Sequence, residues 1–164
     1  MKKTIKRGVA AILYNIMAKM SFGQLKEDIL EVVMDNFMAF GKIAEHYQKM
    51  LEEMNRRILD GIDEKTIKDY NAMAEKSTEE EMEKAFPTIY LLVQKQKKVS
   101  EAIFDKEVEI ELTEVDRKEF CKAVIKGTPN LTAGVLDNFA IMFKEGEKKE
   151  EDFSELDELM KENV

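Results

Sequence analysis

Residues 25–59 read LKEDILEVVMDNFMAFGKIAEHYQKMLEEMNRRIL, and this stretch decides the fold. Its apolar residues recur at alternating spacings of three and four, which is the repeat of a helix with one apolar face. The series consists of Leu30, Val33, Phe37, Phe40, Ala44, Tyr47, Leu51, Met54 and Ile58. We therefore predict one helix from about Leu25 to Leu59, roughly 50 Å long at 1.5 Å per residue.

The apolar series is four heptads long, and it has two interpretations. As a core seam, it packs this helix against the rest of the chain; as a coiled-coil seam, it packs against a second copy. Ile29, Val32, Ile43 and Met50 widen the stripe beyond a coiled-coil seam, which favours a helix with more than one neighbour. Both interpretations stay open from the sequence.

Shorter helical patterns surround the long helix. Thr78, followed three residues later by Glu81, has the spacing of a capping box, as do Asp116 and Glu119. The apolar run 89–93 is compatible with a strand, but spacing up to Phe104 favours a helix there. The predicted helices are 9–20, 64–76, a restart at 77 interrupted by Pro87, 89–104, one from Asp116 to Gly127, and one capped by Thr132.

One short segment, KEVEIELTEVD at residues 106–116, alternates charged and aliphatic residues as a strand does. Glu107, Glu109 and Glu111 point to one face, while the aliphatic residues between them point to the other. A single strand leaves unpaired backbone groups along both edges, so it needs a partner.

The N-terminus is the best partner within the chain. Thr4 and Ile5 lie among Lys2, Lys3, Lys6 and Arg7, so a basic strand would face the acidic one and form cross-strand pairs of opposite charge. We therefore predict a mainly α fold: a helical domain organised on one long helix, with a two-stranded β-ribbon formed by the N-terminus and residues 107–112. An open ribbon edge, with Glu107, Glu109 and Glu111, is a candidate surface for pairing with another protein.

The last part of the chain differs in composition. We predict a single helical domain over residues 1–143 and an acidic tail over residues 144–164, either disordered or a short docked helix. Within the tail, FSELDELM places four apolar residues on one helical face: Phe153, Leu156, Leu159 and Met160. This spacing is typical of a peptide that folds into a partner's groove, and it also fits docking on its own domain.

Composition narrows the function. The 164 residues carry a net charge of −8, which repels phosphate backbones and argues against direct nucleic-acid binding. Cys121 is the only cysteine, so no internal disulfide forms, as suits a cytoplasmic protein of the host cell or one associated with a virion. The basic-then-apolar N-terminus is broken by Tyr14, Asn15 and Lys19, so we expect neither a signal peptide nor a membrane span.

Candidate catalytic residues are few. His46 is the only histidine, and Ile43 stands three residues before it, so the Glu-x-x-His spacing of di-iron bundles is absent. Cys121 would need a neighbouring base to act as a nucleophile, and we interpret it as a core or half-buried thiol. We expect no enzyme activity, no cofactor and no metal.

Three segments carry a resemblance. A basic extended start leading into AILYNIM (11–17), then EVEIEL (107–112) and LTAGVLDNFAIMF (131–143), resembles a family of small uncharacterised bacteriophage and prophage proteins. The resemblance implies a phage or mobile-element origin and carries no catalytic residues over to this chain.

These observations lead to two hypotheses of different class. The first is a non-enzymatic phage or mobile-element protein that acts through protein–protein contacts, as an assembly factor or homo-oligomer. The alternative is an acidic inhibitor that mimics nucleic acid and occupies a host enzyme's basic groove. Carboxylates gathered on one face would favour mimicry, whereas acids scattered among lysines would favour plain solvation.

Overall fold

The computed structural model describes residues 1–144, which form seven α-helices, one 3₁₀ helix and two strands. The chain divides into two compact units. Unit 1 contains Met1, Lys19–Asn36 and, among the described residues, 111–144; unit 2 contains Lys2–Ala18 and Phe37–Ile110. The predicted tail lies outside the described residues, apart from Lys144.

The long helix is present. Helix α2 spans Glu27–Ile58, within two residues of the predicted bounds at its N-terminal end and one at its C-terminal end. Glu27 and Asp28 occupy its first turn and Arg56 and Arg57 its last, the charge order that the helix dipole favours. The helix contributes to both units, residues 27–36 to unit 1 and residues 37–58 to unit 2.

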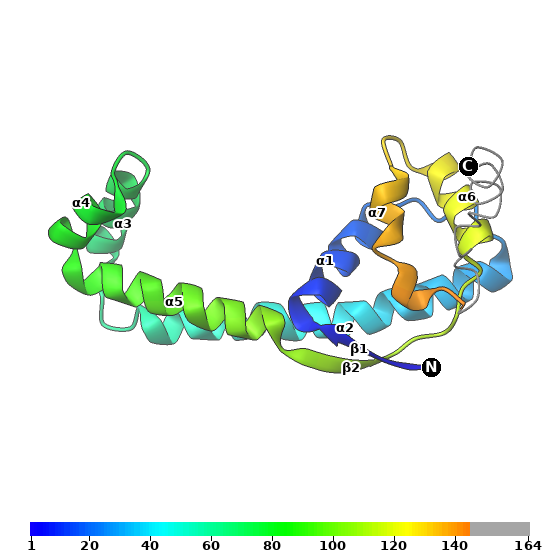
Figure 1. Cartoon of the computed structure of the whole chain (residues 1–164), viewed down its shortest axis with the longest axis horizontal. Helices are drawn as coiled ribbons and strands as arrows, with labels where there is room; N and C mark the ends of the chain where they lie inside the picture. The colour runs from blue at the N-terminus through cyan, green and yellow to red at the C-terminus, as the bar shows by residue number, and fades with distance from the viewer. Residues whose placement is uncertain (145–164) are drawn as a thin grey trace, which may run out of the picture. The chain divides into compact units, whose positions relative to one another are not determined.

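The predicted ribbon is confirmed. Strand β1 (Lys2–Lys6) and strand β2 (Glu107–Glu111) form a two-stranded antiparallel sheet and lie side by side in Figure 1. The Arg7 amide donates to the Lys106 carbonyl oxygen at 2.9 Å. In this register Thr4 faces Glu109 and Lys6 faces Glu107 on the exposed side, while Ile5 and Ile110 are buried on the other. The basic strand therefore pairs with the acidic one as predicted.

Helix α1 (Arg7–Ala18) follows β1 directly, and it begins two residues before the predicted start. Its small residues allow close packing within unit 2. A Cβ on Gly8 would overlap the ring of Phe104 in α5 (Pro87–Asp105), so only glycine fits at this crossing. On the next turns the ring of Tyr14 stacks on Phe37 of α2, with centroids 4.8 Å apart.

The chain turns after α2 at Gly61, whose φ of +80° is a conformation that glycine adopts without strain. Helices α3 (Glu64–Ala74), α4 (Glu79–Ala85) and α5 (Pro87–Asp105) follow, so the ambiguous run 89–93 is helical. Thr78 caps α4 by accepting from the Glu81 amide, as predicted. A small core lies where these helices meet, around Tyr70, Met82 and Ile89.

Unit 1 is built on helix α6 (Arg117–Gly127), helix α7 (Ala133–Asp137) and a 3₁₀ turn (Ala140–Met142). Asp116 caps α6 by accepting from the Glu119 amide, and Thr132 caps α7, both as predicted. The core is aromatic: the ring of Phe120 lies 6.2 Å from that of Phe139 and 5.9 Å from that of Phe143.

One buried polar residue joins α2 to this core. Asn36 is 1% exposed, its Nδ2 donates to the Thr113 carbonyl oxygen at 2.8 Å, and its Oδ1 accepts from the Thr113 amide at 2.8 Å. The side chain thus satisfies the backbone of the segment after β2 in the way that a neighbouring strand would.

Candidate functional sites: a helical hairpin groove and a lysine pocket

The first candidate is the hairpin that the second half of α2 makes with α5 in unit 2. Gln96 of α5 donates a short hydrogen bond to Asn55 of α2. Closer to the ribbon, the rings of Tyr47 and Phe104 meet edge to face with centroids 6.3 Å apart. These contacts hold α5 along the second half of α2, a course that Figure 1 shows.

The apolar stripes of this hairpin are only half-buried. The half-buried residues are Ile43, Tyr47, Met50, Leu51 and Ile58 on α2 and Leu92, Val93, Val99, Ile103 and Phe104 on α5. Two helices share one mutual face, so residues beside that face stay partly accessible unless further elements cover them. The predicted seam is therefore apolar in its whole length but incompletely covered in unit 2.

A cavity of about 300 Å³ opens on one side of this hairpin. Its lining residues are Tyr47, Leu51, Ser100, Glu101, Phe104 and Asp105. The floor is apolar and the rim carries the two carboxylates. We call this surface the hairpin groove.

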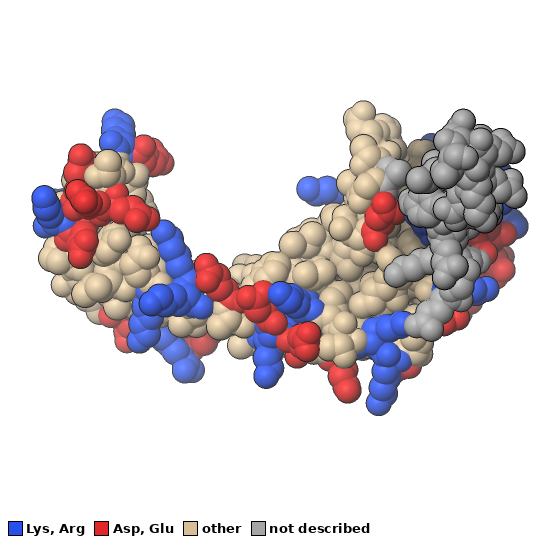
Figure 2. Space-filling model, in the orientation of Figure 1, with Lys and Arg blue, Asp and Glu red and all other residues tan. Residues whose placement is uncertain are grey.

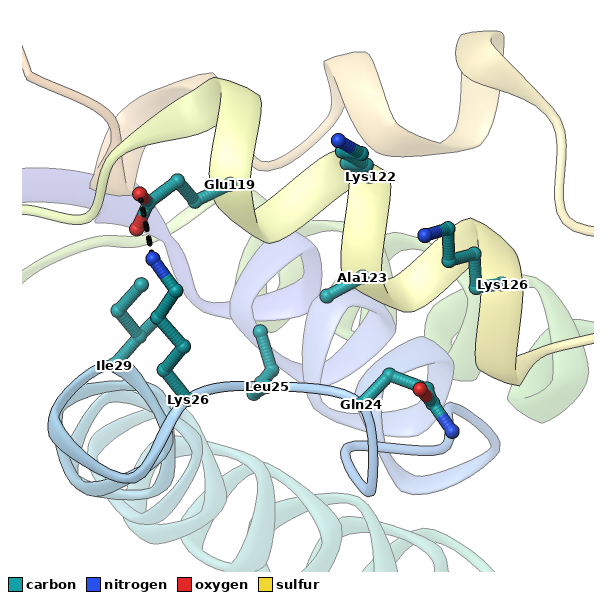
Figure 3. Close-up of a pocket in the computed structure, with 8 residues that line it drawn as sticks. All are labelled: Gln24, Leu25, Lys26, Ile29, Glu119, Lys122, Ala123 and Lys126. Atoms are coloured by element: carbon teal, nitrogen blue, oxygen red, sulfur yellow. Dashed lines mark hydrogen bonds and ion pairs between the residues drawn. The ribbon is translucent and has the colours of Figure 1, made fainter.

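The second candidate is a pocket of about 240 Å³ in unit 1, formed by the segment leading into α2 and by α6. Its lining residues are Gln24, Leu25, Lys26, Ile29, Glu119, Lys122, Ala123 and Lys126. Figure 3 shows Leu25 and Ala123 on its two walls, with Lys122 and Lys126 above them on successive turns of α6. We call this the lysine pocket.

The charges of the lysine pocket are unbalanced. Lys26 Nζ lies 3.4 Å from Glu119 Oε1, so this pair is neutral together. Lys122 and Lys126 have no acidic partner within ion-pair distance among the described residues. Two like charges four residues apart on a helix destabilise it by a few tenths of a kcal/mol, and an anion between them removes that repulsion.

The lysine pocket was not predicted from the sequence. Its only signal is the row Lys118, Lys122, Lys126, which repeats a positive charge every four residues along α6. The second wall comes from residues about 95 positions earlier in the chain, and spacing along the sequence does not bring the two together.

The predicted ribbon residues are placed as expected, on the exposed face of β2. Glu107, Glu109 and Glu111 are all exposed, and the terminal ammonium of Met1 lies 2.8 Å from Glu111 Oε1. The face is therefore partly neutralised within the chain. The other predicted partner-binding residues, Phe153, Leu156, Leu159 and Met160, lie outside the described residues.

The two candidate catalytic residues lie on different helices, His46 on α2 and Cys121 on α6. His46 is exposed on α2. Cys121 is half-buried, and burial raises the pKa of its thiol, which keeps it protonated and poorly nucleophilic at neutral pH. Within residues 1–144, His, Cys, Asp and Glu side chains form no group of three or more that could hold a metal ion.

Charges of both signs are mixed on the face of the molecule that Figure 2 shows. Figure 2 shows lysine and arginine interspersed with acidic residues, apart from a concentration of acids at α3 and α4. Ion pairs along α2 join Lys49 to Glu45 at 2.9 Å and Glu53 to Arg56 and Arg57 at 2.7 and 2.8 Å. By the criterion above, this distribution favours solvation of the surface over mimicry of phosphates.

In the described part of the chain, no helix combines the length and the apolar character that a membrane span requires. Scans of protein-family models, of curated proteins and of solved structures return no match to this chain.

Proposed function

We propose that this chain is a non-enzymatic protein that acts through protein–protein contact, and that its hairpin groove binds a second copy of the same chain. Self-association of this kind suits an assembly factor. The sequence resemblance adds a phage or mobile-element origin to the proposal.

The half-buried stripe of the α2–α5 hairpin is the observation that carries this proposal. Ten apolar residues at helical spacing on α2 and α5 are only half-buried in unit 2, so each keeps part of its surface accessible. A 19-residue helix such as α5 is about 28 Å long, and two helices side by side are about 20 Å wide. One side of the α2–α5 hairpin therefore covers an area of several hundred Å². This approaches the roughly 800 Å² that each partner buries in a stable interface.

The charges on α5 indicate a second copy as the occupant. Lys95, Lys97 and Lys98 precede Glu101 and Asp105, so the middle of the helix is basic and its end is acidic. Lys97 and Glu101 lie one turn apart on the same side of α5, so if two copies of α5 cross antiparallel on this side, Lys97 of each faces Glu101 of the other. A two-fold interface is self-complementary in this way, because each contact occurs twice.

Sedimentation velocity of the full chain over a range of concentrations tests the proposal. We expect a reversible monomer–dimer equilibrium. Lys97→Glu should weaken it about 2- to 30-fold, because two exposed ion pairs of roughly 0.2–1 kcal/mol each become repulsive. Adding Glu101→Lys to Lys97→Glu should restore the equilibrium, since the charges are then exchanged rather than lost.

Lys95→Glu is the matched control. It makes the same charge change two residues away, about 200° around the helix and therefore off the groove, and it should leave the dimer intact. A chain that sediments as a monomer at every concentration contradicts the proposal. So does equal weakening by Lys95→Glu and Lys97→Glu.

A further inference from the structure

We propose that the lysine pocket binds the acidic segment 150–160 of the same chain, with Phe153, Leu156, Leu159 and Met160 over its apolar walls and the intervening carboxylates against Lys122 and Lys126. This goes beyond the proposed self-association, which uses a different surface in the other unit.

Most of the net negative charge of the chain lies after Lys144. Nine of the 34 acidic residues and three of the 26 basic residues lie after Lys144, so this segment carries a net charge of −6. The described residues 1–144 carry only −2. The acidity of the chain is thus concentrated in the segment that follows the described part, whereas the pocket has three lysines and one carboxylate.

The lining of the lysine pocket also matches the segment in its chemistry. Leu25 is buried and Ile29 and Ala123 are half-buried, so a small apolar surface lies between the lysines, and the pocket suits a ligand that is apolar on one side and anionic on its flanks. The sequence EEDFSELDELM at 150–160 has this composition, with apolar residues at spacings of three, three and one. An inorganic anion would satisfy the lysines and leave the apolar walls uncovered.

The segment is attached close enough to reach the lysine pocket. The described chain ends beside the start of α6: the Val115 amide donates to the Met142 carbonyl oxygen at 2.9 Å, and the Lys144 amide donates to the Val115 carbonyl oxygen at 3.3 Å. Phe153 follows Lys144 by nine residues, which span at most about 30 Å when extended. Helix α6 has 11 residues and is about 16 Å long, so every part of the pocket lies within reach.

Attachment to the same chain also favours this occupant. A segment tethered by a short linker has an effective concentration near the millimolar range, so weak contacts suffice to keep the pocket filled. The pocket would then be closed to other acidic amphipathic peptides until one displaces the chain's own segment.

Zero-length carbodiimide cross-linking of the full chain, followed by peptide mass spectrometry, tests the proposal. We expect amide links from Lys122 or Lys126 to carboxylates of residues 150–158, and their loss at high salt. The Lys26–Glu119 pair, at 3.4 Å, gives an internal cross-link that should form in every variant and reports that unit 1 is folded. Mixing ¹⁴N- and ¹⁵N-labelled protein distinguishes links within one chain from links between copies.

Two sets of variants separate charge from apolar contact. Lys122→Glu with Lys126→Glu should reduce binding of an acidic segment about 2- to 30-fold. Adding Glu155→Lys with Glu158→Lys should restore the cross-links, now between carboxylates of the pocket and lysines of the segment. Leu156→Ser with Leu159→Ser should reduce the links to Lys122 and Lys126 and leave the Lys26–Glu119 link unchanged. Lys65→Glu with Lys68→Glu in α3 is the charge control and should have no effect.

The proposal is wrong if links from Lys122 and Lys126 to the segment are absent while the Lys26–Glu119 link forms. It is also wrong if the links join ¹⁴N to ¹⁵N chains, because the occupant is then a second copy. Cross-links that persist in the Leu156→Ser, Leu159→Ser variant overturn the assigned apolar contact. None of these results depends on dimerisation through the hairpin groove, which the Lys97 and Lys95 variants test separately.

Discussion

The two halves of α2 carry the same apolar repeat but differ in how far they are buried. In the first half, residues 27–42, Val33, Asn36 and Phe40 are almost completely inaccessible, whereas in residues 43–58 the most buried apolar side chain, Met54, retains 9% exposure. In unit 1, α6, the 3₁₀ turn and the segment after β2 supply enough neighbours to enclose the core. In unit 2 the second half of the helix shares its stripe mainly with α5. A heptad pattern thus identifies an apolar face, while the number of neighbouring elements decides whether that face becomes core or contact surface.

Truncation of a core side chain to alanine should lower the free energy of unfolding more in unit 1 than in unit 2. Phe120 is fully buried beside two other rings, so Phe120→Ala should lower the free energy of unfolding by about 3–5 kcal/mol. Leu51 is half-buried, and Leu51→Ala should cost roughly half the loss expected at a fully buried leucine, about 1–2 kcal/mol. Urea unfolding followed by circular dichroism measures both.

Ile125→Ala provides the control for these truncations, because it lies on the same helix as Phe120 and is 48% exposed. Its effect should stay within about 0.5 kcal/mol. A cost at Leu51 equal to that at Phe120 would mean that the stripe of unit 2 is covered in solution, as it would be in a dimer at high concentration. Repeating the measurement at lower concentration then separates the two causes.

The polar contact of unit 1 should have the next largest effect. Asn36→Ala removes both hydrogen bonds to Thr113 and should cost about 2 kcal/mol. Hydrogen exchange gives a local measurement, since the Thr113 amide loses its acceptor and should exchange faster. Asn138→Ala, at an exposed position, should leave that amide unchanged. Equal exchange at Thr113 in Asn36→Ala and the parent chain would contradict this role of Asn36.

The smallest expected effect lies on the exposed side of α2 in unit 2. Hydrogen bonds from Arg56 and Arg57 lower the pKa of Glu53 to about 2. Since the folded pKa lies below the unfolded value near 4.5, the stabilisation is complete above pH 4.5 and is lost as the pH falls towards 2. The group is exposed, so salt screens the contribution.

Carboxyl NMR titration of Glu53 checks this pKa. The midpoint should move from about 2 towards 4.5 in the Arg56→Gln, Arg57→Gln variant. A midpoint that does not respond to the loss of both arginines would show that the ion pairs are not formed in solution.

Local chemistry made much of the fold predictable. The period of the apolar residues located α2, the side chains of Thr78, Asp116 and Thr132 located three helix starts, and charge alternation located the ribbon. These signals act over a few residues, or, for the ribbon, through an unusual match of opposite charges. The sequence did not reveal the roles of Gly8 and Asn36, because each depends on a single contact with a residue far along the chain. The lysine pocket was missed for the same reason, since its two walls meet only in the folded chain.

The two strands of the ribbon are far apart in the sequence and are therefore synthesised at different times. Strand β1 ends at residue 6 and its partner β2 ends at residue 111, so at 5–20 residues per second β2 is complete roughly 5–20 s after β1. During that interval the backbone groups of β1 and the small-residue face of α1 have neither β2 nor α5 to cover them. Asn36 is likewise synthesised 77 residues before Thr113, the residue to which its side chain hydrogen-bonds. These surfaces of the nascent chain therefore remain open until residue 111 is made, and a chaperone that recognises apolar segments should bind the chain before that point and release it afterwards.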